Sequence, residues 1–403
     1  MPGPLSHIRV LDMSRILAGP WAGQILADLG ADVIKVERAQ SGDDTRHWGP
    51  PWLKDQQGED TRESGYYLAV NRGKRSIEID LTTDEGKAAI KALAKTSDVL
   101  LENFKVGTLA RYGLGPDDLK AINPKLVYCS VTGFGQDGPR AGEVAYDFMI
   151  QAMGGLMSVT GVPDNDPGGG PQKVGVPIVD IVTGLYAAVS VLAALAQRDQ
   201  DGLGDSVDIA MLDVATSILA NQAMNHLVSG ATPTRKGNKH PNIQPQDVFK
   251  VRDGHLVLAV GNDEQFSRFA NALGQPDWAT DVRFEKNAAR VENLDLLHPM
   301  ICEQLATRDL SEWLDTFADA KVPCGPINTV PMLFAEEQTC HRNMLQDLPH
   351  PLSGTVPSVV SPMKFSRSSL QFDRAPPLLG QHTDELLAEL GLSNSGTITN
   401  ESH

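Results

Sequence analysis

Short apolar runs alternate with amphipathic segments over the first third of the chain. The apolar runs have the length and composition of buried β-strands, and they span residues 8–11, 33–36, 76–80, 98–101 and 126–131. Between them the spacing predicts helices, one over residues 20–29 and one that begins near Thr83. Because strands that alternate with helices form parallel sheets, the pattern predicts an open, mostly parallel α/β domain.

The alternation stops at residues 161–175, a loop rich in glycine, proline and aspartate. The next segment predicts an apolar helix, residues 180–197, buried in the core, and a long helical stretch follows from about Val207 to Leu227. After a polar loop, the pattern over residues 248–260 predicts a hairpin that opens a smaller α/β module.

These changes of pattern divide the 403 residues into four expected parts. They are the first part of a large α/β domain over residues 1–205, a helical connector over 206–230, a small α/β domain over 231–326, and a return segment over 327–403 that completes the large domain. The return segment is punctuated by prolines and is expected to end in a short helix over residues 383–390.

Charge and cysteine usage exclude several classes of function. The chain has 35 Lys and Arg against 51 Asp and Glu, a formal net charge of −16, so neither nucleic acid nor a membrane is expected as a partner. The four cysteines lie far apart without a C-x-x-C pair, and no metal site is expected. The chain starts without a signal or transit pattern, so we expect a cytoplasmic protein, or a mitochondrial matrix protein if it is eukaryotic.

A glycine motif, G-x-G-x-x-G, spans residues 133–138 after a predicted strand. The motif is found in dinucleotide sites, but there it opens a helix after the first strand. Here Pro139 follows the motif, and the strand before it is a late one. A tight turn near a substrate is therefore preferred over a nicotinamide or flavin site, and Gly135 and Gln136 are candidate substrate contacts.

Basic side chains flank several predicted strands, against the acidic background of the chain. Ligands of open α/β sheets bind at strand ends, so these side chains can form an anion pocket if they converge there; if they do not, each is an ordinary solvated charge. They are Lys35, Arg38, Arg72, Lys74, Arg75, Lys105 and Arg111. The turn at residues 14–20 adds backbone N–H groups that can bind a phosphate.

Asp180 stands at the head of the long apolar helix. Aspartate is a common helix N-cap, which is the structural interpretation. The functional interpretation is a nucleophile: the helix dipole keeps the carboxylate ionised, and a desolvated carboxylate can attack an activated acyl group. The glycine-rich loop at 161–175 can then fold over the site and exclude water. The residues alone leave both interpretations open.

Several motifs in a fixed order resemble those of the class III CoA-transferases. They include VLDMSRILAGPWAGQILADLGADVIKVER (10–38), YYLAVNRGKRSIEIDL (66–81), ENFKVGTLARYGLG (102–115), VTGFGQDGP (131–139) and GVPIVDIVTGLYA (175–187). The resemblance implies a Rossmann-like large domain, a smaller α/β domain and an interlocked homodimer. It also implies transfer of CoA from succinyl-CoA, or a similar acyl-CoA, to a dicarboxylic acid such as glutarate.

The resemblance implies a role for each matching residue. Asp180 matches the aspartate that forms a mixed anhydride with the acyl group and then an aspartyl-CoA thioester. The residues that match the CoA pocket are Arg15, Leu17, Ala18, Arg38, Arg72, Lys74, Arg75, Asn103, Phe104 and Arg111. Coenzyme A is then a substrate, and no permanently bound cofactor is expected.

Two departures from the family pattern bear on specificity. The tetraglycine lid of formyl-CoA transferase is missing from residues 236–243, so His240 and Asn242 are candidate substrate contacts there. The related acyl-CoA racemases use a His-Asp pair, whereas Tyr146 stands here in place of the histidine. The loss of one of two bases favours a transferase. A racemase or isomerase, and a CoA-binding protein without catalysis, are the alternatives.

Overall fold

The computed structural model describes residues 3–392 of the chain. These residues form two compact units. The large unit comprises the chain up to Leu156, Val174–Met224 and the chain from Cys340 onward, and the small unit comprises Met157–Lys173 and Asn225–Thr339. The large unit is therefore built from three separate stretches of sequence.

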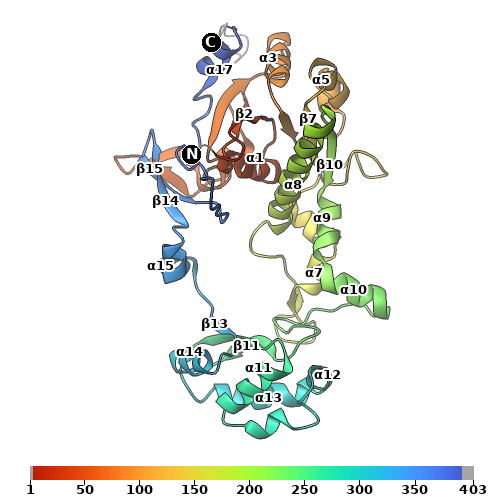
Figure 1. Cartoon of the computed structure of the whole chain (residues 1–403), viewed down its shortest axis with the longest axis vertical. Coiled ribbons are helices and arrows are strands. Elements are labelled where there is room, and N and C mark those ends of the chain that lie inside the picture. The colour runs from red at the N-terminus through yellow and green to blue at the C-terminus, as the bar shows by residue number, and fades with distance from the viewer. Residues whose placement is uncertain (1–2, 393–403) are drawn as a thin grey trace. The chain divides into compact units, whose positions relative to one another are not determined.

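A six-stranded sheet lies at the centre of the large unit (Figure 1). Its strands are β1 (Arg9–Asp12), β2 (Asp32–Arg38), β5 (Lys74–Ile79), β6 (Val99–Glu102), β7 (Val127–Thr132) and β10 (Ser206–Ala210). All neighbours are parallel, in the order β5-β2-β1-β6-β7-β10. The predicted open parallel sheet is confirmed. Successive strands are added from β1 through β2 to β5, and then on the opposite side of β1 from β6 through β7 to β10. The point between β1 and β6, where the strand order changes direction, is a switch point of the kind at which doubly wound sheets bind ligands.

Helices cover both faces of this sheet. On one face, α1 (Ala18–Asp28) and α8 (Ile178–Asp201) share an apolar core with the strands. On the other face lie α3 (Asp84–Lys95), α4 (Thr108–Arg111), α5 (Pro116–Ile122) and α17 (Thr383–Glu389). Strands buried on both faces are apolar throughout, which is why the sequence shows continuous runs there rather than alternation.

Helix α8 is long and apolar enough to cross a membrane by length and composition. One of its faces packs against α1 and the sheet, with Ala187 and Val191 fully buried. Its other face exposes Leu185, Tyr186 and Val189. The expected core helix is therefore buried along one face only.

One predicted element of the large unit is wrong. Residues 206–210 form the edge strand β10, paired with β7, where a helical connector was expected. The sequence Ser-Val-Asp-Ile-Ala alternates polar and apolar residues, which suits a strand that is buried on one side. The helices begin only after it, as α9 (Met211–Ile218) and α10 (Ala220–Ser229).

Shorter elements complete the large unit. They are the 3-10 turn η1 (Asp44–His47), the hairpin of β3 (Trp52–Lys54) and β4 (Asp60–Ser64), α2 (Gly65–Leu68), α6 (Asp147–Met153), and the hairpin of β14 (Leu345–His350) and β15 (Gly354–Val359). The predicted short C-terminal helix is confirmed as α17.

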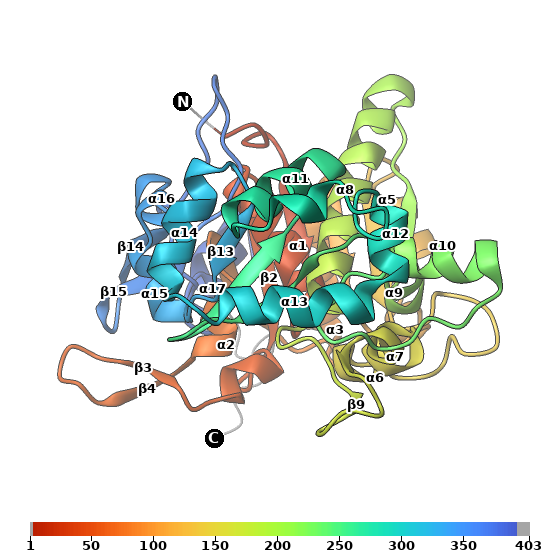
Figure 2. The same cartoon turned by 90° about the horizontal axis from the view of Figure 1, so that it is seen from below.

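The small unit has an antiparallel sheet of β11 (Gln246–Lys250), β12 (His255–Ala259) and β13 (Cys324–Pro326). The predicted hairpin at 248–260 is confirmed by the first two of these strands. Helices α11 (Asp263–Ala272), α12 (Asn287–Glu292), α13 (Leu294–Leu305) and α14 (Leu310–Asp319) belong to the same unit (Figure 2). Stacked Trp313 and Phe317 lie in its apolar core.

The crossing of α8 over α1 depends on Gly184. A Cβ atom at this position would lie 2.6 Å from the Ala18 carbonyl oxygen and 2.9 Å from Cβ of Trp21. We expect Gly184→Ala to lower the free energy of unfolding by about 1–3 kcal/mol, because the helices must separate, although alanine is the better helix former. Urea unfolding measures the change. Gly142→Ala, at a glycine with open space around it, is the control, and an unchanged midpoint for Gly184→Ala would contradict the prediction.

Candidate active site

The loop after β1 lies at the switch point of the sheet and is clamped by Asn103, the residue that follows β6. Oδ1 of Asn103 accepts the Arg15 amide at 2.9 Å, and its Nδ2 donates to the Arg15 carbonyl at 2.7 Å. The next residue, Ile16, has φ +72°, a left-handed conformation that is strained for a β-branched residue. The loop is thus held in one defined shape by the neighbouring strand.

Four fully buried charged residues beneath this loop form what we call the ion quartet: Asp12, Lys35, Asp43 and Lys74. Lys74 Nζ lies 2.8 Å from Asp12 Oδ2, and Lys35 Nζ lies 2.8 Å from Asp43 Oδ2. Lys35 Nζ also donates to the Ser14 carbonyl at 3.0 Å, and Asp12 Oδ1 accepts the Ser14 amide at 3.0 Å. Charges and hydrogen bonds of the quartet therefore hold the loop from below.

Burial and neighbouring charges together set the pKa values of Asp43 and Lys74 in the ion quartet. Burial acts to raise the pKa of Asp43, but the Lys35 ammonium and hydrogen bonds from Lys35 and Thr45 outweigh it and lower the pKa to about 2. For Lys74, burial outweighs the attraction of Asp12 and lowers the pKa to about 8. Lys74 Nζ donates to three acceptors, the carboxylate of Asp12, the Pro20 carbonyl and the Asn71 amide oxygen. The three acceptors stabilise its charged form.

Two adjoining cavities open above the loop. The first, about 200 Å³, has Asp180 in its wall together with Arg15, Leu17, Ala18, Asn103, Phe104, Lys105, Glu143 and Tyr146. The second, about 410 Å³, is lined by the ends of β2 and β5 and includes Arg38. Arg15 and Phe104 belong to both walls, and the guanidinium carbon of Arg15 lies 5.6 Å from the ring centre of Phe104. An elongated ligand can therefore extend from Asp180 towards Arg38.

Asp180 is the third residue of α8, which begins at Ile178, so its expected position as the N-cap is wrong. The cap position belongs to Pro177, which makes no side-chain cap hydrogen bond. Oδ1 of Asp147, the first residue of α6, accepts the amides of Val179 at 2.8 Å and Asp180 at 3.2 Å instead. The Asp180 carboxylate is thereby free to face the cavity.

The environment of Asp180 differs from that expected for a carboxylate at a helix N-terminus. Burial and the nearby carboxylate of Asp147 raise the pKa of Asp180 to about 7. The expectation that the helix dipole keeps the group ionised is thus not met, because burial and the like charge of Asp147 favour the protonated form. A carboxylate with a pKa near neutrality is more basic than an ordinary one and is a stronger candidate nucleophile.

Tyr66 of α2 belongs to this region, although it is missing from the predicted site residues. Burial raises its pKa to about 12, with further contributions from the carboxylates of Asp180, Asp147 and Asp43. Its hydroxyl group therefore stays protonated and can donate a hydrogen bond. The Tyr66 ring meets that of Trp48 edge-on, with 5.0 Å between ring centres. Its place at the start of the YYLAVNRGKRSIEIDL motif is the signal that could have identified it.

Three of the basic residues predicted for the pocket lie elsewhere. Arg72 pairs with Asp28 at 2.6 Å, Lys74 belongs to the ion quartet, and Arg75 pairs with Asp32 at 2.6 Å. Lys74 and Arg75 are the first two residues of β5. They therefore lie at the amino end of a strand, opposite the edge where parallel sheets bind ligands. The Lys74 side chain meets the buried carboxylate of Asp12 and the Arg75 side chain meets the partly exposed Asp32, so neither lines the two cavities.

The remaining predicted residues of the large unit do not lie together at one place. Arg111 is exposed at the end of α4, where its guanidinium donates to Thr108 Oγ1 at 3.3 Å. Gly135 and Gln136 lie in the predicted turn after β7, and the Gln136 amide donates to Asp208 Oδ2 at 2.9 Å. No helix follows that turn before α6.

His240 and Asn242 belong to the small unit. His240 lines a cavity of about 540 Å³ within that unit, along with Lys236, Lys239 and His298. Its Nδ1 accepts the Asn242 amide at 3.1 Å. The two predicted residues are thus brought together, beside a polar cavity of their own unit.

Known proteins resemble the chain over nearly its whole length. A family model described as CoA-transferase family III matches residues 5–383. A succinate–glutarate CoA-transferase of Agrobacterium fabrum is 47% identical, over 96% of this chain and 96% of that protein. A human succinyl-CoA:glutarate CoA-transferase is 39% identical, over 96% and 86% respectively. The crystal structure of a CaiB/BaiF family protein from Brucella suis matches with 46% identity and a TM-score of 0.85, over 97% of this chain and 100% of that one.

The raised pKa of Asp180 predicts a pH-dependent gain in stability for Asp180→Asn. A carboxyl group whose pKa rises on folding, here from 3.8 to about 7, binds its proton more tightly in the folded state. Folding stability is then lost as the pH rises from about 4 to about 7. At 1.36 kcal/mol per pKa unit, the neutral amide should stabilise the protein by up to about 4 kcal/mol at pH 8 and by much less at pH 5.

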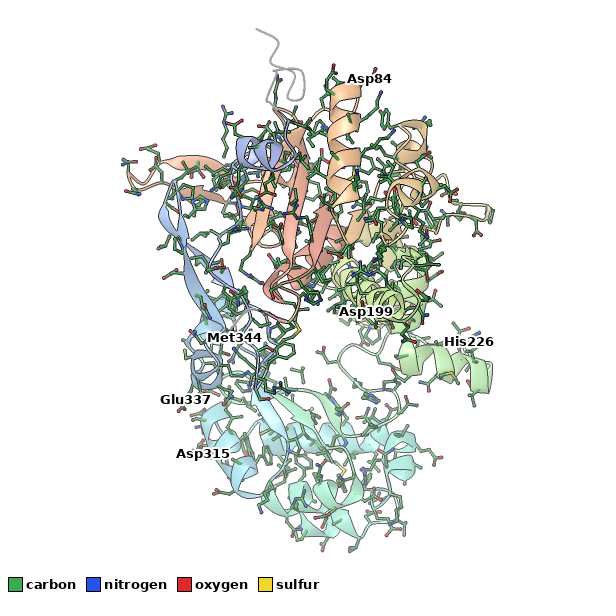
Figure 3. The ribbon with its side chains drawn as sticks, turned by 45° about the horizontal axis from the view of Figure 1, so that its top comes forward. Asp84, Asp199, His226, Asp315, Glu337 and Met344 are labelled. Atoms are coloured by element: carbon green, nitrogen blue, oxygen red, sulfur yellow. The ribbon has the colours of Figure 1, made fainter. Side chains whose placement is uncertain are left out.

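Thermal and urea unfolding at the two pH values measure this difference. Asp199→Asn is the matched control, because Asp199 lies exposed on the same helix (Figure 3). We expect no pH-dependent gain there. Equal effects of Asp180→Asn at pH 5 and pH 8 would contradict the prediction.

Proposed function

The chain belongs to CoA-transferase family III, and from this premise we propose that it transfers CoA from succinyl-CoA to glutarate through a covalent intermediate on Asp180. The relatives named for these two substrates support the choice of donor and acceptor. The observation that carries the mechanism is a buried carboxylate in the wall of a cavity that adjoins a second one, whose wall includes Arg15 and Arg38. CoA thioesters are substrates here, and no permanently bound cofactor is invoked.

The adjoining cavities suit the two ends of an acyl-CoA. The cavity near Arg38 and Arg15 accepts the anionic nucleotide end, because guanidinium groups bind phosphate oxygens with paired hydrogen bonds. The thioester end then extends past Phe104 to Asp180. Binding at a switch point, beyond the carboxyl ends of β1 and β6, is the general rule for sheets of this kind.

The reaction uses Asp180 twice. Its carboxylate oxygen attacks the thioester carbonyl, the C–S bond breaks, and the electron pair leaves with sulfur, which yields a mixed anhydride and CoA thiolate. The thiolate then attacks the aspartyl carbonyl and releases succinate, which leaves an aspartyl-CoA thioester. Glutarate attacks that thioester, and the released thiolate attacks the glutaryl carbonyl of the new anhydride. Glutaryl-CoA forms, and the Asp180 carboxylate is regenerated.

Mass spectrometry of acyl-CoA products tests the proposal. We expect glutaryl-CoA from succinyl-CoA and glutarate, and an adduct of CoA mass on Asp180 during turnover. Asp180→Ala should lower kcat by about three orders of magnitude or more, because it removes the nucleophile. Full activity of that variant would contradict the mechanism. Deuterium exchange at the α-carbon without any acceptor acid would instead indicate a racemase.

We further propose a homodimer, as the family resemblance implies. The exposed apolar side chains Leu185 and Val189 on α8 and Leu227 and Val228 on α10 support it, because soluble monomers rarely leave such surface uncovered. Sedimentation analysis at micromolar concentration should give twice the chain mass of 43.4 kDa. Val189→Asp, which places a charge on the exposed face of α8, should weaken association, and a wild-type monomer would contradict the proposal.

A further inference from the structure

Helix α8 carries the nucleophile but takes its cap from another helix. The first amides of a helix lack intrahelical acceptors, and Pro177 offers no side-chain oxygen. Oδ1 of Asp147 fills this role for Val179 and Asp180, at 2.8 and 3.2 Å. The side chain that fixes the backbone of the nucleophile is therefore a second carboxylate.

Gln151, one turn further along α6, fixes the orientation of Asp147. Its Nε2 donates to Asp147 Oδ2 at 2.6 Å, and its Oε1 accepts the Val174 amide at 2.9 Å. Gln151 is fully buried. Each oxygen of Asp147 thus has a donor, and the segment from Val174 to Asp180 is held at both ends by two residues of one helix.

We propose that Asp147 is a positioning residue that holds the Asp180 carboxylate towards the cavity and places a second carboxylate beside it. The proposal rests on the proposed function. A positioned backbone alone needs only a neutral acceptor, such as serine or asparagine. An aspartate adds like-charge repulsion, which acts on the reactive state of Asp180.

The direction of charge movement explains why such repulsion helps the reaction. When the Asp180 oxygen attacks the thioester, the C–S bond breaks and the negative charge leaves with sulfur. The aspartyl anhydride that remains is neutral. Repulsion from Asp147 is therefore present before attack and relieved after it, so it stabilises the transition state relative to the reactant.

Other charged and titratable groups also face Asp180. Arg15, Lys105, Glu143 and Tyr146 line the same cavity, and Tyr66 lies close enough for the Asp180 carboxylate to raise its pKa. Tyr66, with a pKa of about 12, stays protonated throughout the range of the assay. The acid limb of the rate profile is assigned to Asp180, the group whose pKa burial and Asp147 raise to about 7.

The test compares Asp147→Asn with the wild type. The new amide keeps an oxygen for the two helix amides but removes the charge. In the pH profile of kcat/KM for succinyl-CoA, we expect the acid limb to move from near pH 7 to lower pH by about one pH unit or more. The plateau at high pH should fall by about tenfold, because the nucleophile becomes less basic. Asp147→Ala also removes the cap and should lower kcat further.

A readout without turnover separates this inference from the proposed function. The gain in the free energy of unfolding caused by Asp180→Asn is measured at pH 5 and at pH 8, in both the wild-type and the Asp147→Asn backgrounds. The quantity compared is the increase in that gain from pH 5 to pH 8. We expect a smaller increase in the second background, whether or not CoA transfer is observed. Thr83→Ala, which removes the side-chain cap of α3, is the control for loss of a cap and should leave the acid limb unchanged.

The outcomes are distinct. Absence of CoA transfer in the wild type, or full activity of Asp180→Ala, overturns the proposed function but leaves the stability measurement as the test of Asp147. An acid limb that stays near pH 7 in a folded Asp147→Asn variant, or an equal increase in the stability gain in both backgrounds, overturns the role of Asp147. A folded variant that loses only thermal stability also overturns it, because a purely structural cap would behave that way.

Discussion

The burial of charge beneath the first strand–helix loop is the constraint on which the site depends. Asp12, Lys35, Asp43 and Lys74 lie in the interior with no exposed side-chain surface. Buried ions are costly unless each has a partner, and loss of one partner leaves the other uncompensated. The ion quartet can therefore exist only in an arrangement that satisfies all four residues. That arrangement fixes Ser14 from below, and with it the loop that carries Arg15 to the cavity.

Packing and hydrogen-bond partners also fix the surroundings of Asp180, the proposed nucleophile. Gly184 lets α8 cross close to the Ala18 carbonyl, which brings the first turn of α8 beside the loop held by the ion quartet. Asp147 then supplies the hydrogen-bond acceptor that α8 lacks. As a result, Asp180 is desolvated and lies near a like charge, and both effects raise its pKa. A group of this kind destabilises the fold at neutral pH, as is common for reactive groups in active sites.

Much of the fold was predictable from local pattern. The apolar runs at 33–36 and 126–131 could be read as buried strands because both faces of the sheet are covered. The sequence pattern predicted a helix over residues 206–210, where the structure has a strand. This short, half-buried strand directly precedes a helix, and its apolar residues also fit the apolar spacing of that helix. In the site, Asp180, Arg15 and Asn103 matched family motifs and line one cavity. Tyr66 and Asp147 were missed because their roles depend on contacts between elements distant in sequence.

The sequence by itself determined the alternation of strands and helices, the family and the position of the proposed nucleophile, because these depend on periodicity and on motifs of adjacent residues. Only the tertiary structure decided which charged side chains line the two cavities. Arg72 and Lys74 pair with buried carboxylates and Arg75 pairs with Asp32, away from the cavities. Arg15 and Arg38 line a cavity, where their carboxylate partner is the partly exposed Asp44. The reason is physical: the function of a charged side chain is set by its solvation and its partners, and folding selects both from residues far apart in the chain.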